Sequence, residues 1–237
     1  MTHAVPAIIL DHVTVCYHGV PALEQVCARF EAGSSWAIVG ANGAGKSTLL
    51  KAVMRLVPCD AGTVRWEHLQ HQDIAYLAQQ ADIDRNLPVL AQDLVALGLW
   101  HELRWWRRVS RAQWARVHAA LERVGMLAMA RCAISDLSSG QFQRVLFARM
   151  LVQRARFLLL DEPFNAMDAA TTAELLQVLH DACIMQGAGV VAVVHDQAQA
   201  RDHFDHVLVL DKAVVGVESA EAAGAARPDA GRQEDLE

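Results

Sequence analysis

The N-terminal third of the chain shows short, partly alternating apolar runs that are typical of β-strands. Apolar and polar side chains alternate in part over residues 7–17, where the run ends in a turn at Tyr17-His18-Gly19. A helix is expected from Lys46 to about Leu56, directly after a glycine-rich turn. The expected strands in this part are 7–17, about 25–31, 35–39, 63–66 and 74–77.

The pattern changes between about residues 81 and 155, where apolar residues recur at helical spacing. Strand-length apolar runs then return at 157–160 and 190–194. A helical block inserted into an alternation of strands and helices predicts an α/β core that carries an α-helical subdomain. The expected helices after residue 81 are about 91–99, 111–124, 141–153 and 169–185.

One folded domain is therefore expected at residues 1–216, with the helical subdomain inserted at about 81–155. Residues 217–237 are rich in Ala, Gly, Pro and acidic side chains and hold few large apolar ones, so we expect a disordered tail. This tail carries six acidic residues and two arginines, and thus most of the formal net charge of −6. The remaining body is close to neutral, which argues against a nucleic-acid-binding surface.

Cysteine spacing and apolar run lengths limit the class of protein further. The five cysteines are scattered and include no C-x-x-C pair, which is typical of a reduced, cytosolic protein. The N-terminus lacks the basic and then apolar pattern of a signal peptide. The apolar runs have the length of strands and are far too short to span a membrane.

A glycine-rich segment at residues 40–48 matches the phosphate-binding pattern G-x-x-x-x-G-K-[ST] at each defined position. Its glycines let the backbone curl so that several N–H groups point at one anion, and the helix that follows adds its partial positive charge. Lys46 supplies a mobile charge for the β- and γ-phosphates, and the Ser47 hydroxyl can ligate Mg²⁺. The segment predicts binding of a nucleoside triphosphate through Gly40, Ala41, Asn42, Gly43, Ala44, Gly45, Lys46, Ser47 and Thr48.

Two acidic residues, Asp161 and Glu162, end the apolar run 157–160. The run suits a buried parallel strand, and ligands bind at the carboxyl ends of such strands in open α/β sheets. Asp161 is expected to hold Mg²⁺ through water, and Glu162 to polarise an attacking water as general base. The pair becomes a strong signal because it follows residues 40–48 in the order that a nucleotide site requires.

A third motif, Leu137-Ser138-Ser139-Gly140-Gln141, precedes an expected helix rich in arginine and apolar residues. Serine and glycine here cap the helix, and a capped N-terminus can also bind phosphate. With the two nucleotide motifs, this segment resembles the signature Leu-Ser-Gly-Gly-Gln of the ATPase subunits of ABC transporters. Ser139 replaces the first glycine of that signature. Serine fits there without a positive φ only if the backbone at this position is helical or extended.

The resemblance to ABC ATPases covers residues 7 to about 216, and it implies a fold and cofactors. The implied fold is α/β: a P-loop NTPase core of mostly parallel sheet flanked by helices, with an N-terminal antiparallel β subdomain and an inserted α-helical subdomain. The implied cofactors are ATP and Mg²⁺, with ATP hydrolysis as the activity.

Several site residues follow from this resemblance position by position. Tyr17 lies where these ATPases stack an aromatic ring on adenine, and Gln79 where they carry a glutamine that senses Mg²⁺ and the membrane partner. Ala78 stands in place of the usual proline. His195 matches the switch histidine at the γ-phosphate, so Glu162, His195 and Gln79 form the implied catalytic set. Asp168 lies at the loop that crosses the dimer interface, and it is also a reasonable helix N-cap. Mg²⁺ would be held by Ser47, Gln79 and Asp161, and the partner's ATP would be contacted in trans by Ser138, Ser139, Gly140, Gln141 and Asp168.

The resemblance also implies partners, because the signature cannot complete the nucleotide site of its own chain. The family forms a head-to-tail homodimer with two ATP molecules at the interface, and separate transmembrane permease subunits follow its motion. Segments 82–89, 140–149 and 161–164 are most similar to ATPases of zinc and manganese importers, with zinc the better match. An importer of this kind also works indirectly with an extracytoplasmic solute-binding protein, and its ATPase lies on the cytoplasmic face of the plasma membrane.

Two alternatives remain open at this point. The chain could be an ABC ATPase for another substrate class, or a soluble ABC ATPase acting on nucleic acid or ribosomes. The distance between Lys46 and Ser138 is too short for the long coiled coil of the DNA-repair members, and translation factors carry two nucleotide-binding units per chain. Binding of nucleic acid is therefore not expected.

Two further clusters are open to more than one interpretation. His203 and His206 lie near Asp202 and Asp205, but their spacing fits no regular metal-ligand set, so structural roles are favoured. Tryptophans and arginines interleave between residues 100 and 116. Local packing in a solvated loop is favoured there, followed by contact with the membrane subunit or lipid headgroups and then with nucleic acid.

Overall fold

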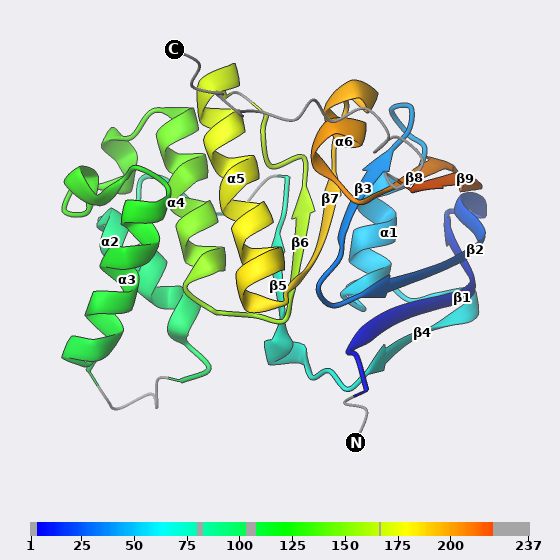
Figure 1. The fold of residues 1–237 in the computed structure, drawn as a ribbon, viewed down its shortest axis with the longest axis horizontal. Coiled ribbons are helices and arrows are strands. Elements are labelled where there is room, and N and C mark those ends of the chain that lie inside the picture. Colours follow the sequence, from blue (N-terminus) through cyan, green and yellow to red (C-terminus); the bar gives the residue numbers. More distant parts are fainter. Residues whose placement is uncertain (1–3, 80–82, 103–107, 166, 220–237) are drawn as a thin grey trace, which may run out of the picture.

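The computed structural model describes residues 4–79, 83–102, 108–165 and 167–219, and it has two β-sheets with helices around them (Figure 1). The smaller sheet is antiparallel, with strand order β2-β1-β4, and the larger has the order β5-β6-β7-β3-β8-β9. The strands are β1 (Ala7–Tyr17), β2 (Val20–Glu31), β3 (Ser35–Val39), β4 (Ala61–Glu67), β5 (Ile74–Leu77), β6 (Phe157–Asp161), β7 (Gly189–Val193), β8 (His206–Asp211) and β9 (Ala213–Ser219). The α-helices are α1 (Lys46–Val53), α2 (Ala91–Ala96), α3 (Arg111–Arg123), α4 (Ser139–Leu151), α5 (Ala169–Gln186) and α6 (Gln197–His203).

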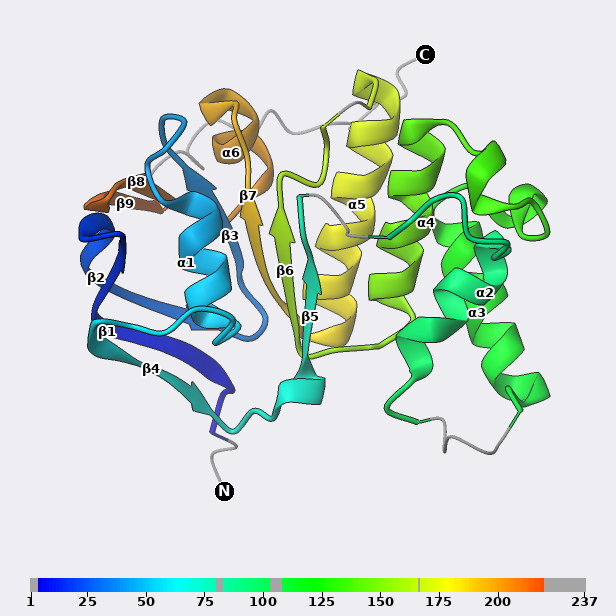
Figure 2. The same ribbon diagram turned by 180° about the vertical axis from the view of Figure 1, so that it is seen from behind.

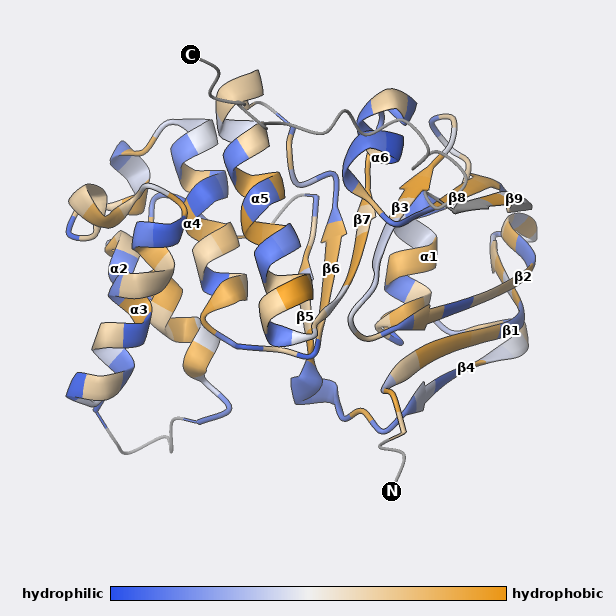
Figure 3. Cartoon of the chain, in the orientation of Figure 1, coloured by the Kyte–Doolittle hydropathy of each residue, from blue (hydrophilic) through white to orange (hydrophobic). Residues whose placement is uncertain are grey.

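The larger sheet is parallel from β5 to β8, and β9 joins its edge antiparallel to β8. Every residue of β6 and β7 is buried, as expected for strands that are covered on both faces. Successive side chains of β6 enter different cores: Phe157 and Leu159 pack toward α1, whereas Leu158 and Leu160 pack toward α5. In Figure 3 these central strands are coloured as hydrophobic along most of their length.

Helix α1 lies between the two sheets (Figures 1 and 2). Its Leu49 and Leu50 share one core with Ile8 and Leu10 of β1 and with Ile38 of β3. The smaller sheet therefore covers the face of the larger sheet on which the glycine-rich segment lies, and it fixes the position of α1.

Helices α2, α3 and α4 form a layer at the end of the molecule opposite the smaller sheet (Figures 1 and 2). Buried residues such as Leu94, Leu121 and Phe147 join these helices in the core that also receives α5. This arrangement confirms the expected α/β class, in which a helical layer is added to a mostly parallel sheet. Among the residues described, none of the helices combines the length and the apolar character that crossing a membrane requires.

The elements that were expected differ from the structure mainly at their ends, whereas α6, β8 and β9 were not among the expected ranges. Helix α1 stops at Val53 and not near Leu56, and the helix expected at 91–99 is α-helical only to Ala96 before it tightens to a 3-10 turn. The domain boundary expected at 216 falls inside β9, because Val217 and Ser219 pair with Leu208 and His206 of β8. Residues 220–237, the rest of the expected tail, lie outside the described residues.

Candidate phosphate site and its catalytic end

The glycine-rich segment follows β3 as a tight loop and leads into α1. Gly43 and Gly45 have φ angles of 82° and 95°, in the left-handed region that favours glycine. A Cβ on Gly40 would lie only 2.1 Å from the Leu210 carbonyl oxygen, so this position has no room for a side chain. The backbone is thus pressed against its neighbours and curled at the N-terminus of α1, the geometry that presents N–H groups to an anion.

Lys46 is the cation of this loop, and its side chain is only 6% exposed. Its Nζ donates hydrogen bonds to the carbonyl oxygens of Gly40, at 2.8 Å, and Ala41, at 2.9 Å. An ammonium group has three donors, so the loop orients the charge while one donor stays available for a phosphate oxygen.

Asp161 ends β6 next to the start of α1 and is 2% exposed. The Ser47 hydroxyl donates to its Oδ1 at 2.9 Å, and the Tyr76 hydroxyl lies 3.5 Å from its Oδ2. Burial raises the pKa of the Asp161 carboxyl, an effect that the Ser47 hydrogen bond opposes. A hydroxyl and a carboxylate side by side are oxygen donors of the kind that Mg²⁺ prefers.

Glu162 is surrounded by three donors that come from three different segments. Its Oε1 lies 2.9 Å from His195 Nε2, and its Oε2 accepts hydrogen bonds from Asn165 Nδ2, at 2.6 Å, and from Gln79 Nε2. Its φ of 51° is uncommon for a residue other than glycine and costs about 1 kcal/mol or more. Gln79 follows β5 and His195 follows β7, so the carboxyl ends of neighbouring parallel strands converge on this carboxylate.

The surroundings of Glu162 keep it ionised. Burial raises the pKa of this carboxyl, but the hydrogen bonds from His195 and Asn165 and the charge of Lys46 outweigh burial, so the pKa is lowered. A carboxylate with a lowered pKa is deprotonated at neutral pH and can accept a proton from water.

The signature segment and Asp168 lie together elsewhere. Ser138 is the N-cap of α4: its Oγ accepts from the Gln141 N–H at 3.2 Å, and Gln141 Oε1 accepts from the Ser138 N–H at 2.9 Å. Ser139 is the first helical residue, so the replaced glycine requires no positive φ. Asp168 caps α5 through the Thr171 N–H, at 2.8 Å, as its sequence position predicted. These residues line one open hollow of about 360 Å³, together with Arg144 and Met167.

The structure thus separates the predicted residues into two groups. Helices α1 and α4 lie on opposite sides of β6 and β7 (Figures 1 and 2), and none of residues 40–48 lines the hollow at the signature segment. Each group of residues could contact phosphate from one side. The fold of a single chain does not bring the two groups together.

Tyr17 and two residues outside the predicted set complete the first group. Tyr17 ends β1 with 44% exposure, in the β1–β2 hairpin whose Ala22 carbonyl abuts Gly45. Asn165 and Tyr76 were missed from the sequence, although both contact the acidic pair. Asn165 follows Glu162 by three residues, and this spacing was the available signal.

Arg85 connects the segment after Gln79 to the signature segment. Its guanidinium donates a hydrogen bond to the Leu137 carbonyl and lies over the Phe142 ring, 4.9 Å from the ring centroid. No motif in the sequence pairs Arg85 with Leu137, which lies 52 residues further along the chain.

The histidine and tryptophan clusters have structural contacts. Asp205 accepts hydrogen bonds from the Ser35 N–H and hydroxyl, at 2.8 and 2.7 Å, and the His206 ring packs on Trp36 with centroids 4.3 Å apart. Trp114 packs against the helical core, whereas Trp100 is 61% exposed. Trp105 and Trp106, with Arg104 and Arg107, lie outside the described residues.

Comparison with known families decides between the chemistries that this geometry allows. Residues 23–165 match the family model described as ABC transporter. The chain belongs to the ABC transporter family. An ABC ATPase of this kind hydrolyses ATP, and its turnover is coupled to transmembrane transport.

Similar proteins match this ABC ATPase over most of its length. They include a chelated iron transport system membrane protein, YfeB, of Yersinia pestis, with 37% identity over 91% of this chain and 76% of that protein. The zinc transport system ATP-binding protein TroB of Treponema pallidum is 39% identical over 88% and 80%. The manganese transport system ATP-binding protein MntB of Bacillus subtilis is 38% identical over 85% and 82%.

A solved structure gives the same picture of the fold. The ATP-binding cassette MJ0796, in a dimeric post-hydrolysis state bound to ADP and Pi, superposes with a TM-score of 0.79. The match has 28% identity and covers 90% of this chain and 98% of that one. The two-sheet core with a helical layer is therefore the architecture of an ABC cassette.

Proposed function

We propose that this ABC ATPase energises the import of a divalent metal ion, with zinc in first place and manganese as the alternative. The observation that carries the proposal is the similarity, over 85–91% of the chain, to relatives named for zinc, manganese and chelated-iron transport. All three named substrates are metals, so metal transport is favoured over other substrate classes. The preference for zinc rests on the sequence of segments 82–89, 140–149 and 161–164.

The first group of residues would bind ATP through its phosphates. Residues 40–48 would surround the β- and γ-phosphates, Lys46 would neutralise their charge, and Tyr17 would stack on the adenine. The positive φ angles of Gly43 and Gly45, which curl the loop at the N-terminus of α1, support this arrangement. Mg²⁺ would be held by Ser47, Asp161 and Gln79, and it would supply charge neutralisation at the phosphates.

Glu162 would act as the general base in hydrolysis. The carboxylate is ionised at neutral pH, as a base must be, and the donors of Gln79, Asn165 and His195 fix its orientation. His195 would also contact the γ-phosphate. Since three donors already point at this carboxylate, little reorganisation is needed when water is activated.

The second group would act on the ATP of another copy. A head-to-tail homodimer would place Ser138, Ser139, Gly140, Gln141 and Asp168 against the partner's γ-phosphate, which explains why the two groups lie apart in one chain. ATP would close this dimer and hydrolysis would open it, because each state binds the nucleotide differently.

The remaining partners would follow from the importer role. Separate transmembrane permease subunits would follow the opening and closing of the dimer, and a solute-binding protein outside the membrane would deliver the metal. The ATPase would lie on the cytoplasmic face of the plasma membrane as a peripheral subunit.

Metal uptake by cells that lack this chain tests the substrate. Uptake of radioactive zinc, manganese and iron would be compared in the deletion strain and after complementation with the wild type, Lys46→Ala or Glu162→Gln. We expect loss of zinc uptake that the wild type restores and neither variant restores.

The control variant is Glu122→Gln, which exchanges an exposed carboxylate for an amide on α3. It should restore uptake as the wild type does. Loss confined to manganese or iron would move the substrate to that metal. Unchanged uptake of all three would contradict a metal importer, even if the purified chain hydrolyses ATP.

A further inference from the structure

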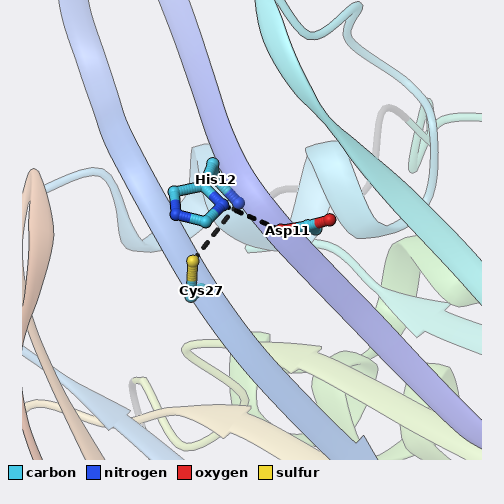
Figure 4. Close-up of side chains that lie close together, drawn as sticks. All are labelled: Asp11, His12 and Cys27. Carbon is cyan, nitrogen blue, oxygen red and sulfur yellow. Dashed lines mark hydrogen bonds and ion pairs between the residues drawn. The ribbon is translucent and has the colours of Figure 1, made fainter.

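The exposed face of the smaller sheet carries a cluster of Asp11, His12 and Cys27, which the nucleotide chemistry does not use (Figure 4). In the β1–β2 ladder, Leu10 pairs with Ala28 and Val13 pairs with Val26. Two residues of β1 therefore oppose the single residue Cys27 of β2, which is a β-bulge. The bulge places both Asp11 and His12 on the solvent side, beside the exposed Cys27.

The three side chains carry different metal-binding atoms within reach of one another. His12 Nδ1 lies 2.8 Å from Asp11 Oδ1, and the His12 backbone N–H donates to Cys27 Sγ at 3.3 Å. One ligand atom from each residue lies within 4.8 Å of the other two. Within the part of the chain that the structure describes, no other group of three His, Cys, Asp or Glu side chains meets this distance limit.

The backbone around the cluster holds this arrangement against local strain. His12 has a φ of 49°, in the left-handed region, and Asp11 pairs with Thr63 of β4 on the other side. A Cβ on Gly62 would lie 2.2 Å from the His12 carbonyl oxygen and 2.4 Å from that of Asp11, so β4 approaches the bulge as closely as only glycine allows. Neighbouring strands therefore fix the bulge from both sides.

We propose that Asp11, His12 and Cys27 form a binding site for a borderline divalent transition metal of the zinc class. A thiolate, an imidazole nitrogen and a carboxylate oxygen are zinc ligands, and this combination disfavours Mg²⁺. Ligands about 2.0–2.3 Å from a tetrahedral ion lie roughly 3.3–3.8 Å apart. The pair at 2.8 Å must open by up to about 1 Å, and a pair at the 4.8 Å limit would have to close by about 1–1.5 Å, which exposed side chains can do.

Water would complete the coordination, since all three residues are at the surface. The ion would join β1 to β2 across the bulge. Binding should therefore stabilise the β1–β2 hairpin, whose turn follows Tyr17. This site is separate from the phosphate loop and does not depend on which ion the transporter carries.

Cobalt titration of the full chain tests the site without ATP. After treatment with a chelator and under a thiol-free reductant, Co²⁺ should bind at one equivalent and produce the near-ultraviolet thiolate-to-cobalt charge-transfer band. Zn²⁺ should remove this band by displacing Co²⁺, and it should raise the thermal midpoint of the apo chain.

Two variants and two matched controls make the test specific. Cys27→Ser should abolish the band, and His12→Asn should weaken cobalt binding at least tenfold, since asparagine also tolerates a positive φ. Cys59→Ser and His68→Asn should leave both readouts unchanged; His68 is likewise exposed and has a positive φ of 55°.

Three results would overturn the proposal. The first is a wild-type chain with no charge-transfer band, and the second is a band that survives in Cys27→Ser. The third is cobalt binding that responds equally to His12→Asn and His68→Asn, which would indicate general binding by surface histidines. None of these readouts depends on ATPase activity or on transport.

Discussion

Replacing Glu162 by glutamine should separate ATP hydrolysis from ATP binding. The amide keeps the size of the carboxylate but cannot accept a proton from water. Loss of a general base typically lowers the rate 10²–10⁴-fold, which corresponds to about 3–5 kcal/mol on the barrier. Residues 40–48 are not changed, so the variant should accumulate as an ATP-bound dimer.

The cost of Glu162→Gln in folding stability should be much smaller. Three donors, from Gln79, Asn165 and His195, now point at a charged acceptor. A glutamine can direct its oxygen toward Gln79 and Asn165 and its amide toward His195, which changes tautomer to accept. Each charge-assisted bond then becomes a neutral one, and with partly exposed donors the total loss is about 1–2 kcal/mol.

The assay measures three quantities on purified wild type, Glu162→Gln and the surface control Glu122→Gln. These are the rate of phosphate release, the nucleotide dissociation constant and the free energy of unfolding in urea. Wild-type turnover in Glu162→Gln would refute the role as base. Equal losses in turnover, nucleotide binding and stability would show that Glu162 acts only as a structural residue.

The remaining predictions concern the phosphate loop, the dimer, the acid limb of activity and the C-terminal segment. Lys46→Ala should weaken nucleotide binding strongly, because it removes the mobile cation from the β- and γ-phosphates; unchanged affinity in a nucleotide titration would mean that residues 40–48 are not the site. Ser138→Arg should be inactive alone, and mixing it with Lys46→Ala should restore about one quarter of wild-type activity, because half of the randomly paired dimers then hold one intact site; normal hydrolysis by a dilute Ser138→Arg monomer would contradict a composite site. Asn165→Ala removes a hydrogen bond that lowers the pKa of Glu162, so the acid limb of the kcat/KM profile should move to higher pH, and an unmoved limb would contradict the assignment of that limb to Glu162. Deleting residues 220–237 should leave the ATPase rate and the thermal midpoint unchanged, since this segment holds too few large apolar residues to offset ordering, and a large drop in the midpoint would show that it docks.

Local signals in the sequence were sufficient for the order of elements from β1 to β7 and for most of the phosphate loop. The run 157–160 is apolar at every position, because β6 is covered on both faces, and Gly43 and Gly45 occur where the backbone needs a positive φ. Such features depend on neighbouring residues only. The expected domain boundary at 216 falls within β9 because the pairing of β9 with β8 depends on backbone hydrogen bonds that composition does not reveal.

Contacts between distant segments could not be predicted in the same way. Tyr76 reaches Asp161, 85 residues further along the chain, because β5 and β6 are neighbours in the sheet. The bulge at Asp11 and His12 depends on the register of β1 with β2 and β4. Strict alternation along β1 would instead place the His12 side chain on the buried face of the sheet. Both features arise from tertiary structure that overrides local preference.

The bond from Arg85 to the Leu137 carbonyl has a consequence for chimeras made from related ATPases. A designer who replaces the segment after Gln79 by one without an arginine at position 85 would also remove the cation that lies over the Phe142 ring. The start of α4 would keep the Leu137 carbonyl and the Phe142 ring but lose the arginine that contacts both. A successful exchange would therefore have to replace residues 83–89 and 137–142 together, although they are far apart in the sequence.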